Sequence, residues 1–551
     1  MSGDKEAIRG GSRLTRRRFL ESSALGGAAA ALTLGGEAPG VAAAPPEGKD
    51  FELDEFTIAD LQGGMKSGKF SAASLTEKYL ARIREIDRAG PAINSVIEVN
   101  PDALEIARGL DRERKAKGPR GPLHGIPILI KDNIATRDRM MTTAGSLALV
   151  GAVPPQDSFV ARSLREAGAV ILGKTNLSEW ANWRSSHSSS GWSGRGGLTH
   201  NPYALDRNPC GSSSGSAVAV SANLCAVAVG TETDGSIVCP SSANGIVGIK
   251  PTLGLVSRSG VVPIAHSQDT AGPMARTVAD AAILLRALAG VDAEDAATAA
   301  SSGKVPADYA KFLDPKGLSG ARVGVVRKYC GFSDAVDRLM NEAIAEMKRQ
   351  GAEVIDPADI DTHGKFADTE DLVLQYEFKA DLNAYLARLA PDAPVHTLAE
   401  IIGFNERNKE KEMPYFGQEL FVKSEARGPL TSKEYVEALE KNHRLARTQG
   451  IDAVMDKFRL DALVAPTGGP AWTTDLVNGD HGAGGSSDAA AVAGYPNISV
   501  PTGFIFGLPV GISFFGRAWS EPTLIKLAYA FELATHQRRP PRFLPTADLR
   551  V

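Results

Sequence analysis

Short apolar runs alternate with amphipathic segments along the chain from residue 57 onward. One amphipathic segment has apolar residues at spacings of four, four and three, which predicts a helix with one buried face. A Ser residue just before it, Ser71 or Ser74, can cap that helix. The apolar face consists of Leu75, Tyr79, Ile83 and Ile86.

Strand-like and helical segments follow one another through the next hundred residues. Residues 95–99 (SVIEV) and 169–176 (AVILGKTN) have the apolar and β-branched character of strands, and 159–168 (FVARSLREAG) is amphipathic. Strands that alternate with helices predict an α/β fold, whose central twisted, mixed and mainly parallel sheet is covered by helices on both faces. Sites in such sheets lie in loops at strand ends.

The second half of the chain repeats this alternation with one helical interruption. Residues 290–318 are predicted to be a surface excursion, and 366–460 to be largely helical. Within that part, the charged run ERNKEKE (Glu406 to Glu412) is interpreted as a solvated helix face. Strand character returns after residue 460, which predicts that the C-terminal part completes the same sheet in one domain over 45–551.

Composition narrows the functional class only slightly. The 551 residues are 43% hydrophobic and 23% charged, with a net charge of -4, which describes a globular chain without the basic surface that nucleic-acid binding requires. The nine histidines include no HExxH motif and no pair at helical spacing, so we expect neither a metal nor a cofactor. Oligomeric state cannot be read from these features.

The first 44 residues resemble a twin-arginine export signal. Paired arginines precede Phe19 and Leu20 in SRLTRRRFL (Ser12 to Leu20), and a small apolar run and an Ala-rich stretch follow. The apolar run is too short and too rich in glycine for a good membrane span. We therefore expect export of the folded protein by the twin-arginine machinery, to the periplasm or outside the cell, without a stable membrane anchor. The alternative is a disordered basic tail.

The richest stretch for chemistry runs from Pro209 to Pro251 and holds two turns that carry serines, GSSSGS (Gly211 to Ser216) and TETDGS (Thr231 to Ser236). The apolar segment between them predicts a short helix and then a buried strand. A serine hydroxyl needs a neighbouring base to act as a nucleophile. Lys131, at the end of the apolar run LHGIPILIK, is a candidate, because burial of a lysine disfavours its charged form. Lowering its pKa from about 10.4 to near 7 corresponds to roughly 4 kcal/mol.

Together these motifs resemble the amidase signature family, whose members use a Ser, cis-Ser, Lys triad. The segments LHGIPILIKDN, CGSSSGS, TETDGSI and SQDTAGPMARTVADAA occur in that order, and the match spans roughly residue 55 to the C-terminus. The resemblance implies the amidase signature fold and hydrolysis of carboxamides to acid and ammonia. It implies Lys131 as base, Ser212 as bridging cis-serine and Ser236 as nucleophile that becomes acylated. Backbone N–H groups of the turn Thr233, Asp234, Gly235 would stabilise the oxyanion.

Within that family the sequence is most similar to bacterial peptide amidases, because of the segment 176–216 and the form TETDGSIV around Ser236. Many family members have an arginine two residues after the nucleophile, where this chain has Val238. The absence of that cation argues against small acidic amides and against a tRNA amidotransferase. Three tryptophans, Trp180, Trp183 and Trp192, either line a cleft for the acyl group or belong to the core.

Other interpretations remain open for several residues. Ser213 could be the nucleophile of a G-x-S-x-G elbow in an α/β-hydrolase-like enzyme, or could only support the site by hydrogen bonds. A broad aliphatic or aryl amidase, or a non-catalytic exported binding protein, would share these motifs. The four cysteines are interpreted as small buried hydrophobic residues, with a disulfide among Cys210, Cys225 and Cys239 as the alternative.

Overall fold

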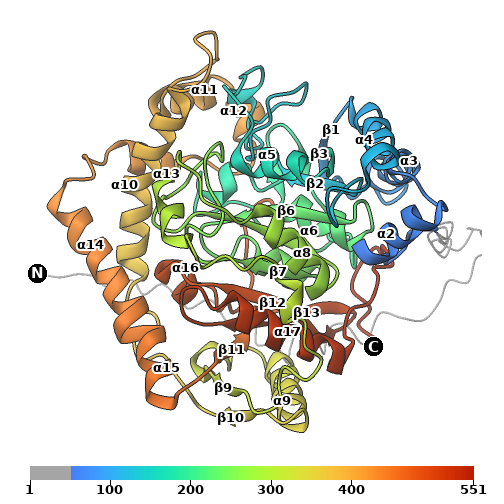
Figure 1. The fold of residues 1–551 in the computed structure, drawn as a ribbon. Coiled ribbons are helices and arrows are strands. Elements are labelled where there is room, and N and C mark those ends of the chain that lie inside the picture. Colours follow the sequence, from blue (N-terminus) through green and yellow to red (C-terminus); the bar gives the residue numbers. More distant parts are fainter. Residues whose placement is uncertain (1–50, 551) are drawn as a thin grey trace, which may run out of the picture. The chain divides into compact units, whose positions relative to one another are not determined.

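The computed structural model describes residues 51–550, which fold around one 11-stranded sheet (Figure 1). The strand order is β1-β3-β2-β6-β8-β7-β12-β13-β11-β9-β10. The strands are β1 (Val96–Val99), β2 (Pro127–Lys131), β3 (Val170–Thr175), β6 (Val227–Glu232), β7 (Val247–Lys250), β8 (Thr270–Ala275), β9 (Arg322–Val325), β10 (Glu353–Ile355), β11 (Ala462–Pro466), β12 (Asn497–Ile505) and β13 (Leu508–Phe515). A separate two-stranded ribbon joins β4 (Trp192–Ser193) to β5 (Gly197–Leu198).

Parallel pairing is confined to two groups of three strands, β3-β2-β6 and β11-β9-β10. The other six neighbouring pairs are antiparallel. The predicted single α/β domain with a mixed sheet between helices is confirmed. Parallel pairs are fewer than the alternation of strands and helices suggested, because β12 and β13 form a hairpin and β8 runs against both of its neighbours.

Helices cover both faces of the sheet, as β13 demonstrates. Phe514 packs against Phe531 of α17 (Glu521–Thr535), with ring centroids 5.6 Å apart. Gly511 lies on the opposite face, because side chains alternate along a strand, and its N–H donates to Ser242 Oγ of α7 (Val238–Ala243) at 2.8 Å. On the α7 side lies α6 (Ser214–Ser221), and on the α17 side lie α8 (Val278–Leu288) and α9 (Asp334–Arg349).

The helix predicted from the spacing of Leu75 and its partners is α3 (Ala72–Arg82), and Ser71 caps it by accepting from the N–H of Ser74. The helix continues as π-helical turns over Ile83–Arg88. The predicted helix at 159 is α5 (Phe159–Glu166), and α2 (Ile58–Ser67) and α4 (Ala103–Lys117) complete the N-terminal group.

Residues 366–460 are largely helical, as predicted, and both α13 (Glu419–Glu425) and α14 (Lys433–His443) pack against α10 (Ala367–Leu386) (Figure 1). The charged run at Glu406–Glu412 is not solvated throughout, because the side chain of Glu412 is fully buried. Its carboxylate accepts from the N–H of Leu147 at 2.6 Å. The helices here are α10 (Ala367–Leu386), α11 (Leu398–Arg407), α12 (Lys409–Glu412), α13 (Glu419–Glu425), α14 (Lys433–His443) and α15 (Asp452–Phe458), with α16 (Asp488–Ala493) after β11.

The two ends of the described chain meet beside α6. The guanidinium of Arg538 pairs with the carboxylate of Glu55 at 2.8 Å and donates to the carbonyl of Ser221 at 2.8 Å. The predicted export signal, residues 1–44, lies outside the described residues. Within residues 51–550, no helix has both the length and the apolar character needed to cross a membrane.

Candidate active site

Lys131 is the last residue of β2, and its side chain is fully buried. Its amine lies 2.7 Å from Ser212 Oγ, 2.8 Å from Thr231 Oγ1 and 3.3 Å from the carbonyl oxygen of Thr231. Burial lowers the pKa of Lys131 to about 7, although Asp269 and Glu232 act in the opposite direction. A substantial fraction of this amine is therefore neutral at physiological pH and able to accept a proton.

Ser212 follows a cis peptide bond from Gly211, and its side chain is fully buried beside Lys131. Gly211 is required here, because a Cβ at this position would lie 2.2 Å from Ser178 Oγ. Ser213 points elsewhere: its hydroxyl donates to the carbonyl of Thr231 at 2.9 Å and accepts from the Thr231 N–H at 3.1 Å. The fully buried Ser213 hydroxyl is thus held by main chain, which supports the turn and disfavours Ser213 as an elbow nucleophile.

Ser236 lies just before α7, next to the serine turn: its carbonyl accepts from the N–H of Ser213 at 3.1 Å. The side chain of Ser236 is 7% exposed. Within residues 51–550 its hydroxyl makes no hydrogen bond, and it is not among the fully enclosed oxygen atoms. The structure therefore brings the three predicted residues into one region and leaves the Ser236 hydroxyl free to react with a ligand.

The turn before Ser236 carries the predicted oxyanion donors. Gly235 has a φ of 74°, the left-handed region that favours glycine, and this allows the turn to close. The amides of Thr233 and Asp234 donate to no acceptor within the described residues. The Gly235 amide is instead directed at the carboxylate of Glu232, whose pKa is raised by burial although this amide acts in the opposite direction. Thr233 and Asp234 are therefore the better placed of the three backbone donors.

Sequence reasoning missed the groups that support this turn. The buried Glu232 carboxylate accepts from the amides of Ile237 at 2.7 Å and Val238 at 3.0 Å, at the start of α7. The Thr233 hydroxyl donates to Asp269 Oδ1 at 2.5 Å. The sequence offers only one indication of Glu232 and Asp269: each is an acidic residue inside a motif of the family resemblance, TETDGSI and SQDTAGPMARTVADAA respectively.

A disulfide joins the two serine turns. Cys210 and Cys239 are bonded, with Cα atoms 6.1 Å apart, while Cys225 and Cys330 are free. The interpretation of all four cysteines as unpaired hydrophobic residues is therefore wrong for this pair, because the fold places the residue before Gly211 against the start of α7. The bond ties the segment that carries Ser212 to the helix that follows Ser236.

The three predicted cleft tryptophans occupy different places. Trp192, in β4, packs edge-on against Phe416 with ring centroids 5.2 Å apart. Trp183 packs against Phe378 of α10 at 6.5 Å, and Trp180 against Phe421 of α13 at 5.7 Å. All three are thus part of the packing of the helical region, and Trp180 alone also borders a crevice.

That crevice, called here the Asn133–Trp180 crevice, lies between the end of β2 and the segment 262–264. Asn133 connects it to Lys131, because the Asn133 amide nitrogen donates to Thr231 Oγ1 at 2.9 Å. Asn133 belongs to the motif LHGIPILIKDN. Neither a role for Asn133 nor this connection was predicted from the sequence. The lining residues are Asn133, Ala144, Trp180, Ala181, Val262, Pro263 and Ile264.

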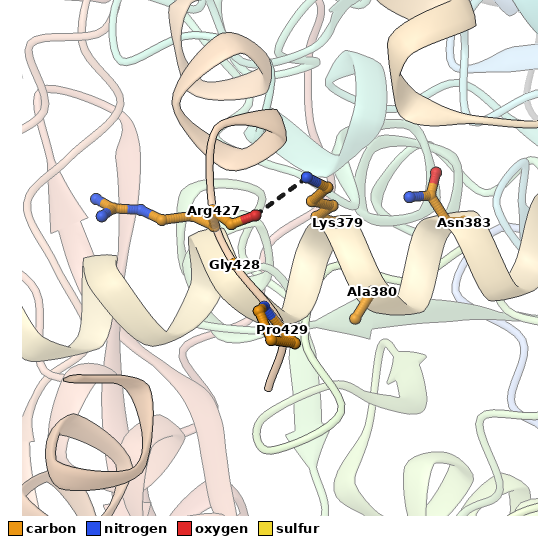
Figure 2. Close-up of a pocket in the computed structure, with 6 residues that line it drawn as sticks. All are labelled: Lys379, Ala380, Asn383, Arg427, Gly428 and Pro429. Carbon is orange, nitrogen blue, oxygen red and sulfur yellow. Dashed lines mark hydrogen bonds between the residues drawn. The ribbon is translucent and has the colours of Figure 1, made fainter. Parts of the chain in front are cut away.

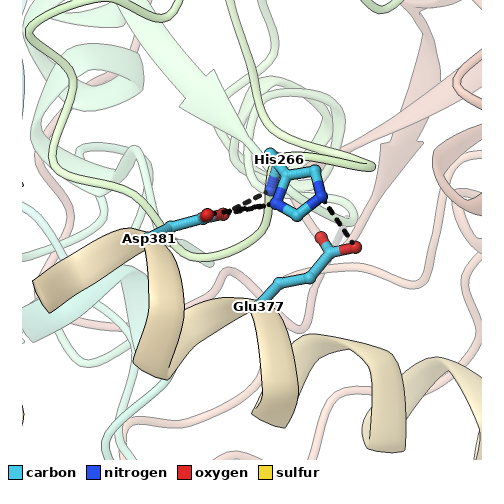
Figure 3. Close-up of side chains that lie close together, drawn as sticks. All are labelled: His266, Glu377 and Asp381. Carbon is cyan, nitrogen blue, oxygen red and sulfur yellow. Dashed lines mark hydrogen bonds and ion pairs between the residues drawn. The ribbon is translucent and has the colours of Figure 1, made fainter. Parts of the chain in front are cut away.

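Within residues 51–550, the side chains of His266, Glu377 and Asp381 form the one group close enough to share a metal ion, with ligand atoms within 4.8 Å of one another (Figure 3). His266 Nδ1 lies 2.8 Å from Asp381, and Nε2 lies 3.4 Å from Glu377. These carboxylates raise the pKa of His266 against the effect of its burial. A protonated imidazole between two carboxylates accounts for this geometry, so we interpret the group as an ion-pair clamp that fastens the loop before β8 to α10.

A hollow of about 340 Å³ lies beside α10 and contains none of the predicted site residues (Figure 2). Its one amine, Lys379 Nζ, donates to the carbonyl of Arg427 at 3.0 Å. It shares no lining residue with the Lys131 network and holds no serine, so we assign it no part in the chemistry. The hollow is lined by Lys379, Ala380, Asn383, Arg427, Gly428 and Pro429.

Comparison with known proteins agrees with this arrangement. A family model described as "Amidase" matches residues 74–525. A probable amidase of Arabidopsis thaliana is 45% identical over 503 residues, which cover 90% of this chain and 93% of that protein. The native peptide amidase from Stenotrophomonas maltophilia is 52% identical, with a TM-score of 0.85 over 90% of this chain and 99% of that one. A peptide amidase in complex with the competitive inhibitor chymostatin is also 52% identical, with a TM-score of 0.86 over 89% of this chain and 100% of that one.

Proposed function

Because this chain belongs to the amidase signature family, and is a hydrolase that acts on amide bonds, we propose that it converts C-terminal peptide amides to peptide acids and ammonia. The observation that carries the proposed mechanism is the buried Lys131 amine, 2.7 Å from Ser212 Oγ, with a pKa lowered by burial to about 7. A general base with a pKa near the working pH is substantially in its unprotonated form and is still basic enough to take a proton from the nucleophile.

In the proposed first half-reaction, Ser236 Oγ attacks the carbonyl carbon of the substrate amide. Its proton passes to Ser212 Oγ as the Ser212 proton passes to neutral Lys131. The tetrahedral oxyanion accepts hydrogen bonds from the amides of Thr233 and Asp234. When the carbon–nitrogen bond breaks, a proton returns from Lys131 through Ser212 to the nitrogen, and ammonia leaves an acyl-enzyme on Ser236.

In the second half-reaction, water takes the place of ammonia. Lys131 and Ser212 remove a proton from the water as it attacks the acyl-enzyme, and the proton then returns to Ser236 Oγ. The carboxylic acid is released and the three side chains regain their starting protonation states. No metal or cofactor takes part in this sequence.

Two features support peptide amides over other carboxamides. The solved structures at 52% identity include peptide amidases, one of them bound to a competitive inhibitor. The residue two positions after Ser236 is Val238, so no cation stands there to hold a free carboxylate. The second candidate is a broad aliphatic or aryl amidase with the same mechanism.

The experiment is ammonia release from an N-acetylated amino acid amide by the protein and by Ser236→Ala, Ser212→Ala and Lys131→Met. We expect each variant to lose at least about a hundredfold in kcat, as for removal of a nucleophile or general base. Lys174→Met is the matched control, because Lys174 is equally buried, on the neighbouring strand β3, but bonds to Ile134 O at 2.6 Å and Thr142 Oγ1 at 2.9 Å.

The outcomes separate the candidates. Full activity of Ser236→Ala would overturn the triad. Activity toward simple amides but not peptide amides would favour the broad amidase with the triad intact. Binding of peptide amides by a wild-type protein that releases no ammonia from any amide would favour a binding protein.

We also propose that residues 1–44 direct export of the folded protein to the periplasm or beyond. The support is the paired arginines and the apolar run after them. Replacing Arg16 and Arg17 together by lysine should leave the enzyme active but retain it in the cytoplasm, measured as amidase activity in cell fractions. Unchanged export of that variant would refute the assignment.

A further inference from the structure

Two consecutive residues of the loop before β8 hold Thr233, which lies in the proposed oxyanion turn. Gln268 is 1% exposed, and its amide nitrogen donates to the carbonyl oxygen of Thr233 at 3.3 Å. The nitrogen of Gln268, rather than its oxygen, must face Thr233, because a carbonyl oxygen can only accept a hydrogen bond. Asp269 Oδ1 accepts from the Thr233 hydroxyl at 2.5 Å. The main chain and the side chain of Thr233 are thus both held by this loop.

The hydrogen bond from Gln268 also fixes a second group, because a carbonyl and the N–H of the next residue belong to one rigid peptide plane. The peptide bond between Thr233 and Asp234 is trans, so the Thr233 carbonyl and the Asp234 N–H point in opposite directions. Gln268, on the carbonyl side, therefore directs the Asp234 N–H away from itself. That N–H donates to no acceptor within the described residues and is one of the two proposed oxyanion donors.

The direction of this peptide group depends on few other contacts. Within residues 51–550, no main-chain N–H donates to the Thr233 carbonyl, so Gln268 supplies its hydrogen bond. Gly235, on the other side of Asp234, has a φ of 74° and belongs to the residue type with the greatest backbone freedom. Without the hydrogen bond from Gln268, the Asp234 N–H would have little to keep it in one direction.

Helix α10 fixes the position of Gln268. The amide nitrogen of Gln268 also donates to Glu370 Oε1, in the first turn of α10, at 2.9 Å. The N–H of the preceding residue, Ser267, donates to Glu377 Oε2 of the same helix at 2.9 Å. The ion-pair clamp of His266 holds the loop to α10 one residue earlier (Figure 3). Gln268 therefore connects a fixed helix to the oxyanion turn.

From this geometry we propose that Gln268 is a positioning residue for amide hydrolysis, which aims the Asp234 N–H at the oxyanion by holding the carbonyl of the same peptide group. Gln268 acts through Thr233 and Asp234 rather than on the substrate itself. The inference rests on the proposed function and deepens it, because it names the side chain that prearranges an oxyanion donor. Since the oxyanion forms only in the transition state, the loss of Gln268 should lower kcat and not raise KM.

The test is the variant Gln268→Met, which keeps the length of the side chain and removes the amide. With N-acetylleucinamide as substrate, we expect kcat to fall about tenfold to hundredfold, because a misdirected donor is weakened rather than removed. KM should stay within about twofold of the wild-type value. A kcat close to that of the wild type, or a loss of kcat/KM carried by KM, would overturn the proposal.

If Gln268→Met does not fold, Gln268→Asn takes its place. Its shorter side chain keeps the polar group but holds the amide nitrogen one methylene farther from the Thr233 carbonyl, a bond that is already 3.3 Å long. We expect the same loss of kcat without a rise in KM. Wild-type kcat in the folded Gln268→Asn variant would overturn the proposal.

Gln418→Met is the matched control. Gln418 is also buried, and its amide nitrogen also donates to one main-chain carbonyl and one glutamate, Ile402 O at 3.1 Å and Glu406 Oε1 at 3.0 Å. These bonds join the start of α13 to α11 and do not involve the oxyanion turn. We expect urea to unfold this variant about as easily as Gln268→Met, but kcat to equal that of the wild type. The same loss of kcat in both variants would overturn the proposal.

A pair of inhibitors measures the oxyanion without turnover. When Ser236 Oγ adds to the aldehyde N-acetylleucinal, the oxygen–carbon bond forms, the carbonyl π electrons become the oxyanion, and the serine proton passes through Ser212 to Lys131. The alcohol N-acetylleucinol forms no oxyanion. Gln268→Met should weaken inhibition by the aldehyde about tenfold to hundredfold, as it lowers kcat, and leave the alcohol within about twofold. Equal effects on both inhibitors, or none, would overturn the proposal.

Failure of the proposed function is distinguishable from failure of this inference. If the wild type releases ammonia from 4-methylpentanamide but not from N-acetylleucinamide, the peptide amidase proposal fails. Gln268 is then judged on 4-methylpentanamide: a lower kcat at unchanged KM in Gln268→Met supports its role, and an unchanged kcat refutes it. If the wild type releases ammonia from neither compound, the inference fails together with the proposed mechanism.

Discussion

At the scale of single residues, the chemistry depends on a lysine placed where lysines are rarely found. Lys131 could be singled out from the sequence because it ends an apolar run, and burial predicts the direction of its pKa. Its partner Thr231, and Asn133, which donates to Thr231, could not, because threonine and asparagine are ordinary residues at strand ends. Only the pairing of β2 with β6 brings residues 131 and 231 together.

The pKa of Lys131 predicts the pH dependence of the reaction. With a pKa of about 7, its neutral form increases as pH rises, so kcat/KM should rise from pH 5.5 and level off above about pH 8. A pH series of ammonia release measures this. Burial and Asp488 also raise the pKa of Asp234 to about 7, so the same series with Asp234→Asn is the control, and a rise that vanished in that variant would assign the titration to Asp234.

Lys131 should also reduce stability. Its pKa falls from 10.5 in water to about 7 in the fold, so the unfolded chain binds more protons between these values and stability increases with pH across that window. At pH 7, Lys131→Met removes this cost but also removes the hydrogen bonds of the amine. The net result should be a free energy of unfolding higher by on the order of 1–3 kcal/mol. Urea unfolding measures the difference. A variant less stable than wild type at pH 7 would contradict this cost.

At the scale of elements, the segment between β3 and α6 is held by a buried carboxyl pair. Glu179 and Glu412 are both fully buried, and a Cβ on Gly194 would lie 2.9 Å from Glu179 Oε2 and 2.5 Å from Glu412 Oε2. Burial, together with Glu412, raises the pKa of Glu179 well above 4.5, although Arg184 acts against this. The charged run that ends at Glu412 predicted a helix but not this contact, because the partner is more than two hundred residues away.

Glu179 therefore makes stability depend on pH in the opposite direction from Lys131. A carboxyl with a raised pKa binds more protons in the folded state, so its contribution is complete below the unfolded value of 4.5 and is lost as pH rises toward the folded pKa. Glu179→Gln should flatten the fall in Tm between pH 5 and 8. Thermal unfolding across that range measures it. An unchanged slope would show that Glu179 is already ionised.

At the scale of the whole molecule, most elements followed from periodicity, but their order in the sheet did not. The strands β12 and β13 were predictable from their apolar character. Their place in the sheet was not, because β12 pairs with β7, more than two hundred residues earlier in the chain. For the same reason, the sequence did not decide whether a disulfide forms among the cysteines. Cysteine spacing carries no information on which turns the fold brings together.

The Cys210–Cys239 disulfide should contribute to stability, because it closes a loop with a sequence separation of 29. Removing both sulfurs in a Cys210→Ser, Cys239→Ser double variant should lower the free energy of unfolding by about 2–4 kcal/mol. Urea unfolding of wild type, with and without a reductant, gives the matched comparison. Equal stability of the oxidised and reduced proteins would leave the bond without a structural role.

The sheet order also decides when the protein can finish folding. The hairpin β12–β13 lies inside the sheet, and Arg538 closes the structure against Glu55, which was synthesised nearly five hundred residues earlier. A chain synthesised only as far as residue 466 therefore has an open gap in its sheet, with unpaired edges on β7 and β11. The two parts of the sheet can join only after residues 497–515 have been synthesised and have paired with both edges.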